Sequence, residues 1–500
     1  MIDRFVLASF ALLVLTLGPG CASGSWGTDY SGAAGTPGAR RVQTDVLQLP
    51  ATPAAPAGRV LLISVTGLAG EAYADAAAPA MPTLDALARD GVRVDRLDPV
   101  APASTYPGHA TLVTGRFPAS HGITGDQVLS DSGIHPVPPW HASRLRGESL
   151  WGAAQASGRS VISLGWPTTV GAAISLLVPD LYPMRRGDTW IDAIAAGTSP
   201  WLLERLRVRM PSDAPAGWPD LRERDALVVD LACDAARLAN PPQLWLVRLV
   251  APSEPLGREG PDSSAMRSAL AQVDAEIDRL LGCLAASGQL AETSVVVVGD
   301  QAWLSVHTRI EPNIALRGAG LIARDPRLET GVRVWKAIVR SNGGSAFVYA
   351  KDDASALLAR EVLSREAEAT SAFRIVPASE MSRRGADPEA WFGLEARPGY
   401  VFGNEVRGSR ILSASPVRGA GGYFDRGVGH AISLVGWGAG LRQGVTIPMM
   451  PAVDVAPTLA LLLEVPLQEA DGRPFVGALA FDPDVERSLR ESERVTRVAP

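Results

Sequence analysis

Residues 103–115 read Ala-Ser-Thr-Tyr-Pro-Gly-His-Ala-Thr-Leu-Val-Thr-Gly. Pro107 suits the first turn of a helix, where its missing N–H has no intrahelical partner to lose. Thr105 fits the N-terminus of that helix, and its hydroxyl is of the type that caps helices. The stretch therefore predicts a helix that begins near Thr105 and carries a hydroxyl at its N-terminal end.

Short apolar runs and amphipathic stretches alternate around this segment. The apolar runs, which indicate strands buried on both faces, are Val60–Val65, Ser160–Leu164, Leu244–Val250 and Ser294–Val298. Amphipathic stretches such as 82–89 and 264–284 lie between them and predict helices. The alternation predicts an α/β fold: a doubly wound, mostly parallel sheet with helices on both faces. Residues from about 314 to 410 depart from this rhythm and predict a small inserted α/β cap.

The N-terminus predicts export. A largely apolar run of 13 residues, 5–17, follows Arg4, which is short for a membrane span and right for a signal peptide over 1–20. Cys21 follows small residues and resembles the lipidated cysteine of bacterial lipoproteins, although Gly18 stands where that pattern has Leu. Lipidation, ordinary secretion and a retained anchor stay open. All three predict a location outside the cytoplasm, either periplasmic or membrane-anchored.

The remaining divisions follow from composition. Residues 21–58 are rich in Ala, Gly and Pro and predict a flexible tether, residues 59–480 predict the folded domain, and 481–500 predict a charged tail. The chain has 500 residues, 46% of them hydrophobic and 20% charged, so it can bury a large core. Its formal net charge of −6 gives no electrostatic case for nucleic acid as a partner.

Cys233 and Cys283 both fall in helical patterns. We interpret them as buried thiols, because the exported location permits a disulfide but the sequence does not establish one.

Residues 103–115 resemble the nucleophile segment of type I phosphodiesterases and nucleotide pyrophosphatases, whose pattern is T-[FY]-P-N-H-x-x-L-V-T-G. These enzymes belong to the alkaline phosphatase superfamily. Further blocks that resemble this family, particularly its bacterial branch, are Trp166-Pro167, Gly260–Ser263, Asn342–Ala346, Leu394–Tyr400, Val453–Thr458 and Asp471–Arg473. The resemblance spans about residues 59–476 and implies the alkaline-phosphatase-like fold.

The resemblance also implies roles for single residues. Thr105 stands at the position of the nucleophile, which in the family lies at a helix N-terminus that favours a phosphate anion. Gly108 stands where the family has an Asn that contacts phosphate. The alternative for Thr105 is a helix cap and nothing more.

The family holds two zinc ions with three Asp and three His. At the six matching positions this chain has Thr66, Ser253, Gly257, Asp300, Gln301 and Gly421, so Asp300 alone is retained. Zinc requires carboxylate, imidazole or thiolate donors. The sequence therefore predicts that the two-zinc site is lost and that the chain holds no metal cofactor.

Other acidic residues or histidines could replace the lost ligands and bind a metal ion. Glu71, Glu254, Glu259 and Asp425 lie near vacated positions in sequence, and with Asp300 they would suit Mg²⁺ or Ca²⁺. We interpret them instead as solvated loop carboxylates. Among the histidines, only His430 lies where it has a chance of reaching the old site.

The leading hypothesis is therefore a pseudo-enzyme outside the cytoplasm. It would bind a phosphorylated ligand in the old cleft, or an envelope protein through the cap. The first alternative is a residual phosphodiesterase that uses Thr105 with Asp300 and a single substituted metal. The second is a structural envelope lipoprotein attached to the membrane by its lipid.

Overall fold

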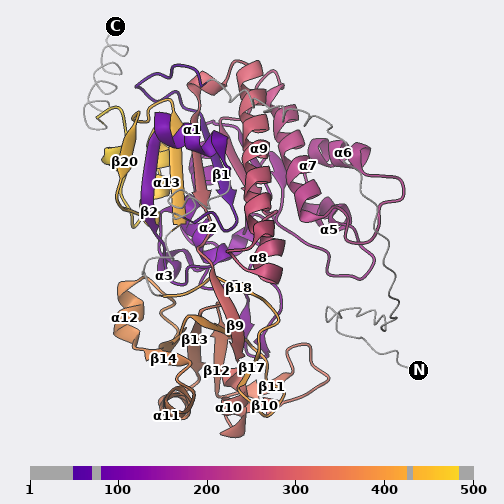
Figure 1. The fold of residues 1–500 in the computed structure, drawn as a ribbon, viewed down its shortest axis with the longest axis vertical. Helices are drawn as coiled ribbons and strands as arrows, with labels where there is room; N and C mark the ends of the chain where they lie inside the picture. Colours follow the sequence, from indigo (N-terminus) through magenta and orange to yellow (C-terminus); the bar gives the residue numbers. More distant parts are fainter. Residues whose placement is uncertain (1–48, 70–79, 425–431, 483–500) are drawn as a thin grey trace, which may run out of the picture. The chain divides into compact units, whose positions relative to one another are not determined.

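The computed structural model describes residues 49–69, 80–424 and 432–482. A central sheet forms the larger part of the fold (Figure 1). Its strand order is β20-β2-β19-β8-β1-β7-β5-β6, and β21 also pairs with β2. Its strands are β1 (Val60–Val65), β2 (Val92–Asp98), β5 (Val161–Leu164), β6 (Leu176–Val178), β7 (Leu244–Leu249), β8 (Ser294–Gly299), β19 (Ile432–Gly438), β20 (Val445–Ile447) and β21 (Met450–Pro451). Strand β19 runs antiparallel to both neighbours, β2 and β8, and the other pairings are parallel.

Helices cover both faces of this sheet, as the sequence predicted. The two faces of the sheet form separate hydrophobic cores, as strand β1 illustrates. Leu61 and Ile63 belong to one core, and Val60 and Leu62 belong to the other. The first core is closed by α1 (Pro82–Asp90), α5 (Trp190–Ile194), α6 (Pro200–Arg209), α7 (Leu221–Ala236) and α9 (Ser264–Ala286). The second is closed by α2 (Thr105–Thr114), α4 (Leu150–Ala156) and α13 (Val455–Leu462). Burial on both faces explains why these strands are continuous apolar runs.

Helix α2 begins at Thr105, as the sequence predicted. Ser104 occupies the N-cap position, and neither hydroxyl makes a capping hydrogen bond, so the interpretation of Thr105 as the cap is wrong. The helix ends at Thr114, and its C-cap Gly115 has a left-handed φ of 66° and donates its N–H to the carbonyl of Thr111. Such an end favours glycine because a side chain is strained at positive φ.

A smaller layer carries its own hydrophobic core. Its antiparallel sheet has the order β12-β13-β15-β14, and a second sheet joins β16, β9 and β17, with β18 also on β9. The strands are β9 (Leu304–Ile310), β10 (Ile322–Arg324), β11 (Val332–Trp335), β12 (Ala337–Ser341), β13 (Ser345–Ala350), β14 (Phe373–Val376), β15 (Phe392–Ala396), β16 (Gly399–Phe402), β17 (Leu412–Ala414) and β18 (Gly419–Ala420). The helices are α10 (Pro312–Gly318), α11 (Asp353–Thr370) and α12 (Ala378–Arg383). We call this smaller subdomain the cap. Strands β9 and β18 pair within it, so the cap extends beyond the predicted residues 314–410 at both ends.

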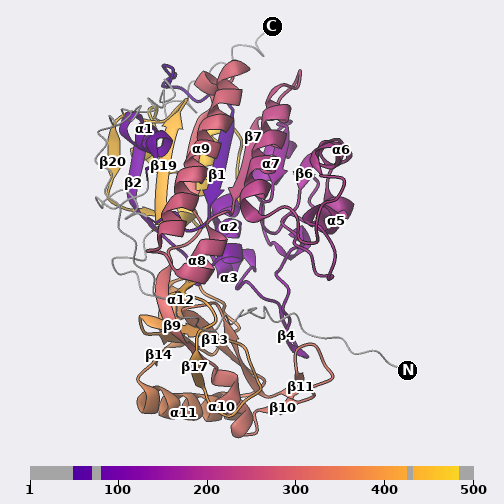
Figure 2. The same cartoon turned by 45° about the vertical axis from the view of Figure 1, so that its right-hand side comes forward.

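Cys233 and Cys283 form a disulfide between α7 and α9, with their Cα atoms 5.4 Å apart. The interpretation of both as free thiols is therefore corrected. The two helices pack side by side (Figure 2), which brings together cysteines that are 50 residues apart in sequence.

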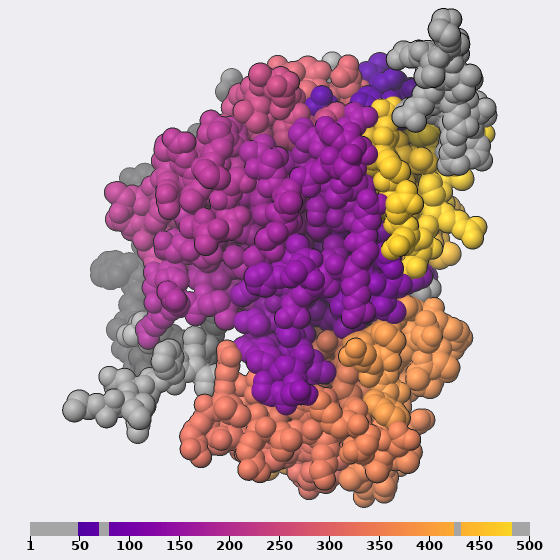
Figure 3. All heavy atoms as spheres, turned by 180° about the vertical axis from the view of Figure 1, so that it is seen from behind, coloured from indigo at the N-terminus to yellow at the C-terminus, as the bar shows by residue number. Residues whose placement is uncertain are grey.

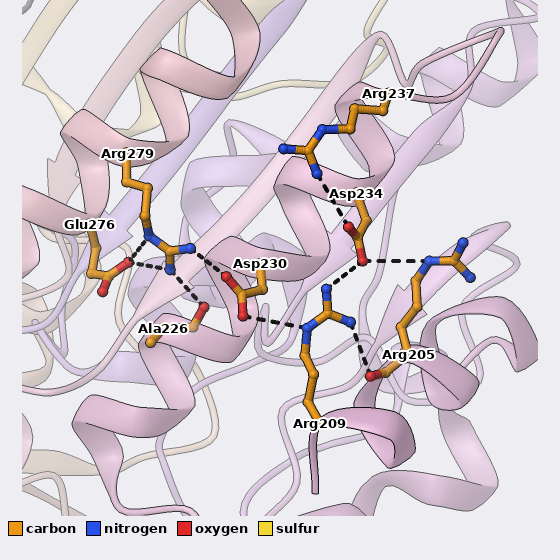
Figure 4. A network of polar contacts seen from close by, with 8 residues as sticks. All are labelled: Arg205, Arg209, Ala226, Asp230, Asp234, Arg237, Glu276 and Arg279. Carbon is orange, nitrogen blue, oxygen red and sulfur yellow. Dashed lines mark hydrogen bonds and ion pairs between the residues drawn. The ribbon is translucent and has the colours of Figure 1, made fainter. Parts of the chain in front are cut away.

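Ion pairs reinforce the same helix layer (Figure 4). Arg279 on α9 pairs with Asp230 on α7, and Arg209 on α6 pairs with Asp234 on α7 at 2.8 Å. Each pair is partly exposed, so each adds little alone. Together with the disulfide, they connect three helices that lie on one face of the sheet.

Within the described residues, no helix is both long enough and apolar enough to cross a membrane. The predicted signal peptide over 1–20, Cys21 and most of the tether lie outside the described residues. So do Glu71, Asp425, His430 and the tail from residue 483.

Candidate functional site

The ends of three parallel strands bring most of the predicted site together. Thr66 directly follows β1, Asp300 and Gln301 directly follow β8, and Ser253 follows β7 by a short turn. Strands β7 and β8 flank β1 on either side, so all three ends meet at one edge of the sheet. This edge is where doubly wound folds place their binding sites.

Asp300, which the sequence predicts to be the one retained ligand position, is buried and accepts a hydrogen bond from the backbone. Its Oδ1 accepts a hydrogen bond from the N–H of Gly67 at 3.0 Å. Its Oδ2 and the hydroxyl of Thr66 are both buried, and neither makes a hydrogen bond of good geometry with a described residue. Burial raises the pKa of Asp300 to about 6, and the positive charge of Arg248 limits the rise.

Gln301 fills the space between Thr105 and Gly421. Its Nε2 donates to the hydroxyl oxygen of Thr105 at 3.2 Å. Its Oε1 lies against Gly421, where an added Cβ would be only 2.3 Å from that oxygen. The buried amide of Gln301, itself at a predicted ligand position, therefore lies between the expected nucleophile Thr105 and the predicted ligand position Gly421.

The cap holds Gly421 in place. A Cβ at Gly343, whose φ is 93°, would lie 2.3 Å from the carbonyl oxygen of Gly421. The N–H of Gly344 donates to that same carbonyl at 2.8 Å. Close approach and positive φ explain the glycines of the Asn342–Ala346 block. The contacts of Gly343 and Gly344 with the Gly421 carbonyl also hold the backbone of Gly421 in position.

Ser253 and Gly257 lie on a short helix, α8 (Ser253–Glu259). Leu256 on α8 is fully buried and packs against the strand ends. A Cβ at Gly67 would lie 2.5 Å from Leu256 Cδ1, so an apolar group packs beside the backbone that binds Asp300. A Cβ at Gly257 would meet no atom within 4 Å.

The acidic substitutes on α8 do not join the site. Glu254 is exposed and pairs with Arg258 at 2.9 Å along the same helix, and Glu259 is exposed as well. Both agree with their interpretation as solvated carboxylates.

An acidic side chain occupies the N-terminus of α2. Asp126 accepts hydrogen bonds from the N–H of Tyr106 at 2.8 Å and from the hydroxyl of Ser104 at 3.2 Å. Helix N-termini attract anions through their free N–H groups. Burial raises the pKa of Asp126, although both hydrogen bonds favour its charged form. Gly108 lies in the first turn of α2, where a Cβ would be 3.3 Å from the carbonyl oxygen of Asp300.

A buried ion cluster next to this helix was missed from the sequence. Asp180 accepts from Arg248 at 2.9 Å, from Arg224 at 3.1 Å and from the hydroxyl of Tyr106 at 2.9 Å. All four residues are buried. Burial alone would raise the pKa of Asp180, but the charges of Arg248 and Arg224 outweigh it and hold that pKa below its ordinary value. The sequence signal was Arg248 itself, a charge inside the apolar run 244–250.

The two histidines nearest Thr105 in sequence are structural. His109 Nδ1 lies 2.7 Å from the carbonyl oxygen of Thr105 and must donate to it, so Nε2 accepts from Ser64 Oγ at 2.7 Å. His121 is the opposite tautomer, since its Nδ1 accepts from the N–H of Ile123 at 3.1 Å. Burial lowers the pKa of both imidazoles to about 3, so both stay neutral.

The side chains at the strand ends do not fit a pair of zinc ions. Across the parts of the chain that the structure describes, no group of three or more His, Cys, Asp or Glu could hold a metal ion. The six matching positions offer one carboxylate, two hydroxyls, one amide and two glycines. Zinc is held by four donors drawn from imidazole, thiolate and carboxylate, and these positions do not supply them.

The fold is alkaline-phosphatase-like. The family model for type I phosphodiesterase/nucleotide pyrophosphatase matches residues 60–392, and the chain belongs to this family.

Curated relatives match over shorter stretches. Human ectonucleotide pyrophosphatase/phosphodiesterase family member 1 is 26% identical over 159 residues, which cover 30% of this chain and 17% of the human protein. A Caenorhabditis elegans ectonucleotide pyrophosphatase/phosphodiesterase is 26% identical over 250 residues, covering 48% of this chain and 28% of the relative. The matches thus span less than a third of either relative.

Solved structures support the same fold. Human ectonucleotide pyrophosphatase/phosphodiesterase 5 has a TM-score of 0.59 at 17% identity and covers 83% of this chain and 97% of its own. An inactive variant of the murine protein in complex with AMP has a TM-score of 0.58 at 18% identity, with the same coverage. At these identities the likeness concerns the fold alone.

Proposed function

We propose that this chain is a non-hydrolytic member of its family, a pseudo-enzyme whose strand-end site does not hold two zinc ions. The observation that carries the proposal is the position of Gln301, which bonds to Thr105 and packs against Gly421. In the family, the corresponding positions supply zinc ligands around the nucleophile. Here they are joined to one another by a neutral side chain.

The surroundings of Thr105 also argue against a metal-free nucleophile. A threonine hydroxyl needs a base or a cation to attack an ester. The Nε2 group of Gln301 only donates hydrogen bonds, so it cannot take the proton of Thr105. His109 is neutral, and the carbonyl of Thr105 and the hydroxyl of Ser64 engage both its ring nitrogens.

The acidic group at the helix N-terminus supports the same conclusion. Asp126 takes the N–H of Tyr106 at the place where a substrate phosphate would receive N–H groups. When charged, its carboxylate repels a phosphate. Phosphate binding at Thr105 would therefore require Asp126 to be protonated or displaced.

We place this protein outside the cytoplasm, either lipidated at Cys21 or secreted. The support is the run of residues 5–17 after Arg4, with small residues before Cys21. The disulfide between Cys233 and Cys283 agrees with an oxidising compartment.

The test combines metal content with turnover. The purified chain is dialysed against zinc, its metal is measured by mass spectrometry, and hydrolysis of bis-p-nitrophenyl phosphate is followed with and without added zinc. We expect far less than one zinc per chain and turnover at the blank rate, unchanged in Thr105→Ala. One or two tightly held zinc ions, or zinc-dependent turnover abolished by Thr105→Ala, would overturn the proposal. A stoichiometric Mg²⁺ or Ca²⁺ with turnover would instead support the residual hydrolase.

A further inference from the structure

A cavity of ligand size lies away from the strand ends. It has a volume of about 850 Å³ and lies between residues 119–146, which follow α2, and the cap. Figure 3 shows the purple segment after α2 resting on the orange cap. By contrast, the space that Gly108 and Asp300 line at the strand ends measures about 10 Å³. Small-molecule sites are commonly 300–1,000 Å³, so only the former is of ligand size.

The walls of this cavity are already joined to each other. A hairpin of β3 (Leu129–Ser130) and β4 (Gly133–Ile134) reaches the cap, where Trp335 Nε1 donates to the carbonyl of Ser130 at 3.0 Å. Lys351 lies over the Trp335 ring at 4.1 Å and forms an ion pair with Asp131. A ligand would therefore meet a largely formed site, which lowers the entropic cost of binding.

Buried polar groups line the cavity on the cap side. Arg340 has 6% of its side chain exposed, and its Nη2 donates to the carbonyl of Thr124 at 2.6 Å and to Asp387 at 3.3 Å. The hydroxyl of Tyr349 donates to the same carboxylate at 2.7 Å. The Nε of Arg340 is buried and has no hydrogen-bond partner among the described residues. This cluster holds a guanidinium in a fixed orientation beside the cavity.

The charges around the cavity do not cancel. Arg340 is paired with Asp387 and Lys351 with Asp131. Arg144 and Arg146 also line the cavity and are exposed, and neither forms an ion pair with a described residue. The remaining acidic lining residue is Glu389. The cavity lining therefore carries two guanidinium groups and one carboxylate that form no ion pair with a described residue.

We propose that this cavity is a binding site for a small molecule that carries a phosphate or carboxylate group, held by Arg144 and Arg146. Guanidinium groups bind both anions through paired N–H donors. The polar lining favours a hydrogen-bonding ligand over a lipid. The site is separate from the strand ends, so it stands whether or not those ends hold a metal.

Calorimetry on the full chain tests the proposal with matched probes. AMP is compared with adenosine, glucose 6-phosphate with glucose, and citrate with glycerol, which separates phosphate from carboxylate recognition. The key variant is Arg144→Gln/Arg146→Gln. The control is Arg360→Gln/Arg365→Gln, which removes two exposed arginines of α11 that do not line the cavity.

We expect at least one anionic probe to bind saturably, with a Kd below about 1 mM, while its neutral counterpart does not. The key variant should weaken this binding by about tenfold or more, and the control variant and Thr105→Ala should leave it unchanged. No saturable binding of any probe overturns the proposal, and so does undiminished binding by the key variant. Loss of binding in Thr105→Ala would place the ligand at the strand ends and also overturn it.

Discussion

The Nε2 of Gln301 donates a hydrogen bond to Thr105 Oγ1 at 3.2 Å, and this contact joins the end of β8 to the first residue of α2. In the family, the corresponding pair would be a zinc ligand and the nucleophile that the zinc activates. Here the contact is between two neutral groups, and Gln301 also takes up the room beside Gly421. This geometry predicts that substitutions at Gln301 and Gly421 have coupled effects on the free energy of unfolding.

Gly421→Ala should destabilise the fold by about 1–3 kcal/mol, because its Cβ would lie 2.3 Å from Gln301 Oε1. In a Gln301→Ala background the nearest remaining atom is the carbonyl oxygen of Ala302 at 3.1 Å, so the same substitution should cost less. Denaturant unfolding of the two single variants and the double variant measures the coupling, which we expect to reach about 1 kcal/mol. Strictly additive effects would show that the two residues are not in contact.

Asp180→Asn should destabilise the fold by about 3–5 kcal/mol, since it leaves two buried arginines without their shared carboxylate. Arg248→Met should cost less, because Arg224 and Tyr106 still bond to Asp180. In Arg248→Met the pKa of Asp300 should rise above about 6, because the positive charge of Arg248 lowers this pKa in the native protein. Unfolding in urea compares the variants.

A surface pair is the control for this cluster. Asp90 pairs with Arg89 at 2.8 Å on an exposed part of α1, so Asp90→Asn should change stability by no more than about 0.5 kcal/mol. An Asp180→Asn variant as stable as the Asp90→Asn variant would contradict the buried ion cluster.

Asp225 should make stability fall as pH rises. Burial raises its pKa to about 7, although its carboxylate accepts from the N–H groups of Val250 and Ala251. A group whose folded pKa is raised stabilises the fold below its unfolded pKa of about 3.9 and loses that contribution as pH rises through the folded value. The window therefore runs from about pH 4 to about pH 7.

Urea unfolding at several pH values checks this dependence. Asp225→Asn should remove a decrease on the order of 2–4 kcal/mol between the two ends of the window. Asp95→Asn, which removes a surface carboxylate, is the control and should keep the native slope. An unchanged slope in Asp225→Asn would mean that this carboxyl does not titrate in the window.

The disulfide should stabilise the helix layer. Replacing Cys233 and Cys283 with Ser should lower the free energy of unfolding by about 2–4 kcal/mol, because the bond closes a loop between residues 50 apart. Alkylation of the denatured chain before and after reduction counts the thiols. Two additional labels after reduction confirm the bond, and labelling of both cysteines before reduction contradicts it.

Local sequence was sufficient for the main fold. The apolar runs that became β1, β5, β7 and β8 are short and continuous because both faces of the sheet are buried, and this pattern does not depend on distant residues. The beginning of α2 at Thr105 was likewise predicted from the chemistry around Pro107. The family blocks then predicted that the strand ends would carry the site.

Contacts between distant segments were not accessible in the same way. The sequence placed Cys233 and Cys283 on helices, but only the packing of α7 against α9 brings their Cα atoms to 5.4 Å. Arg248 was visible as a charge within a strand, yet its partners come from three other segments. Asp126 gave no local signal of its place at the α2 N-terminus.

The sequence by itself predicted which chemical groups stand at the six positions that match the family's ligands, because each position follows a strand or motif that can be recognised locally. Tertiary structure decided what those groups do. It set the amide of Gln301 between Thr105 and Gly421, left about 10 Å³ beside Gly108 and Asp300, and opened about 850 Å³ against the cap. The physical reason is that a strand or a helix is encoded by its own periodicity. A cavity or an ion cluster exists only where side chains from separate elements meet.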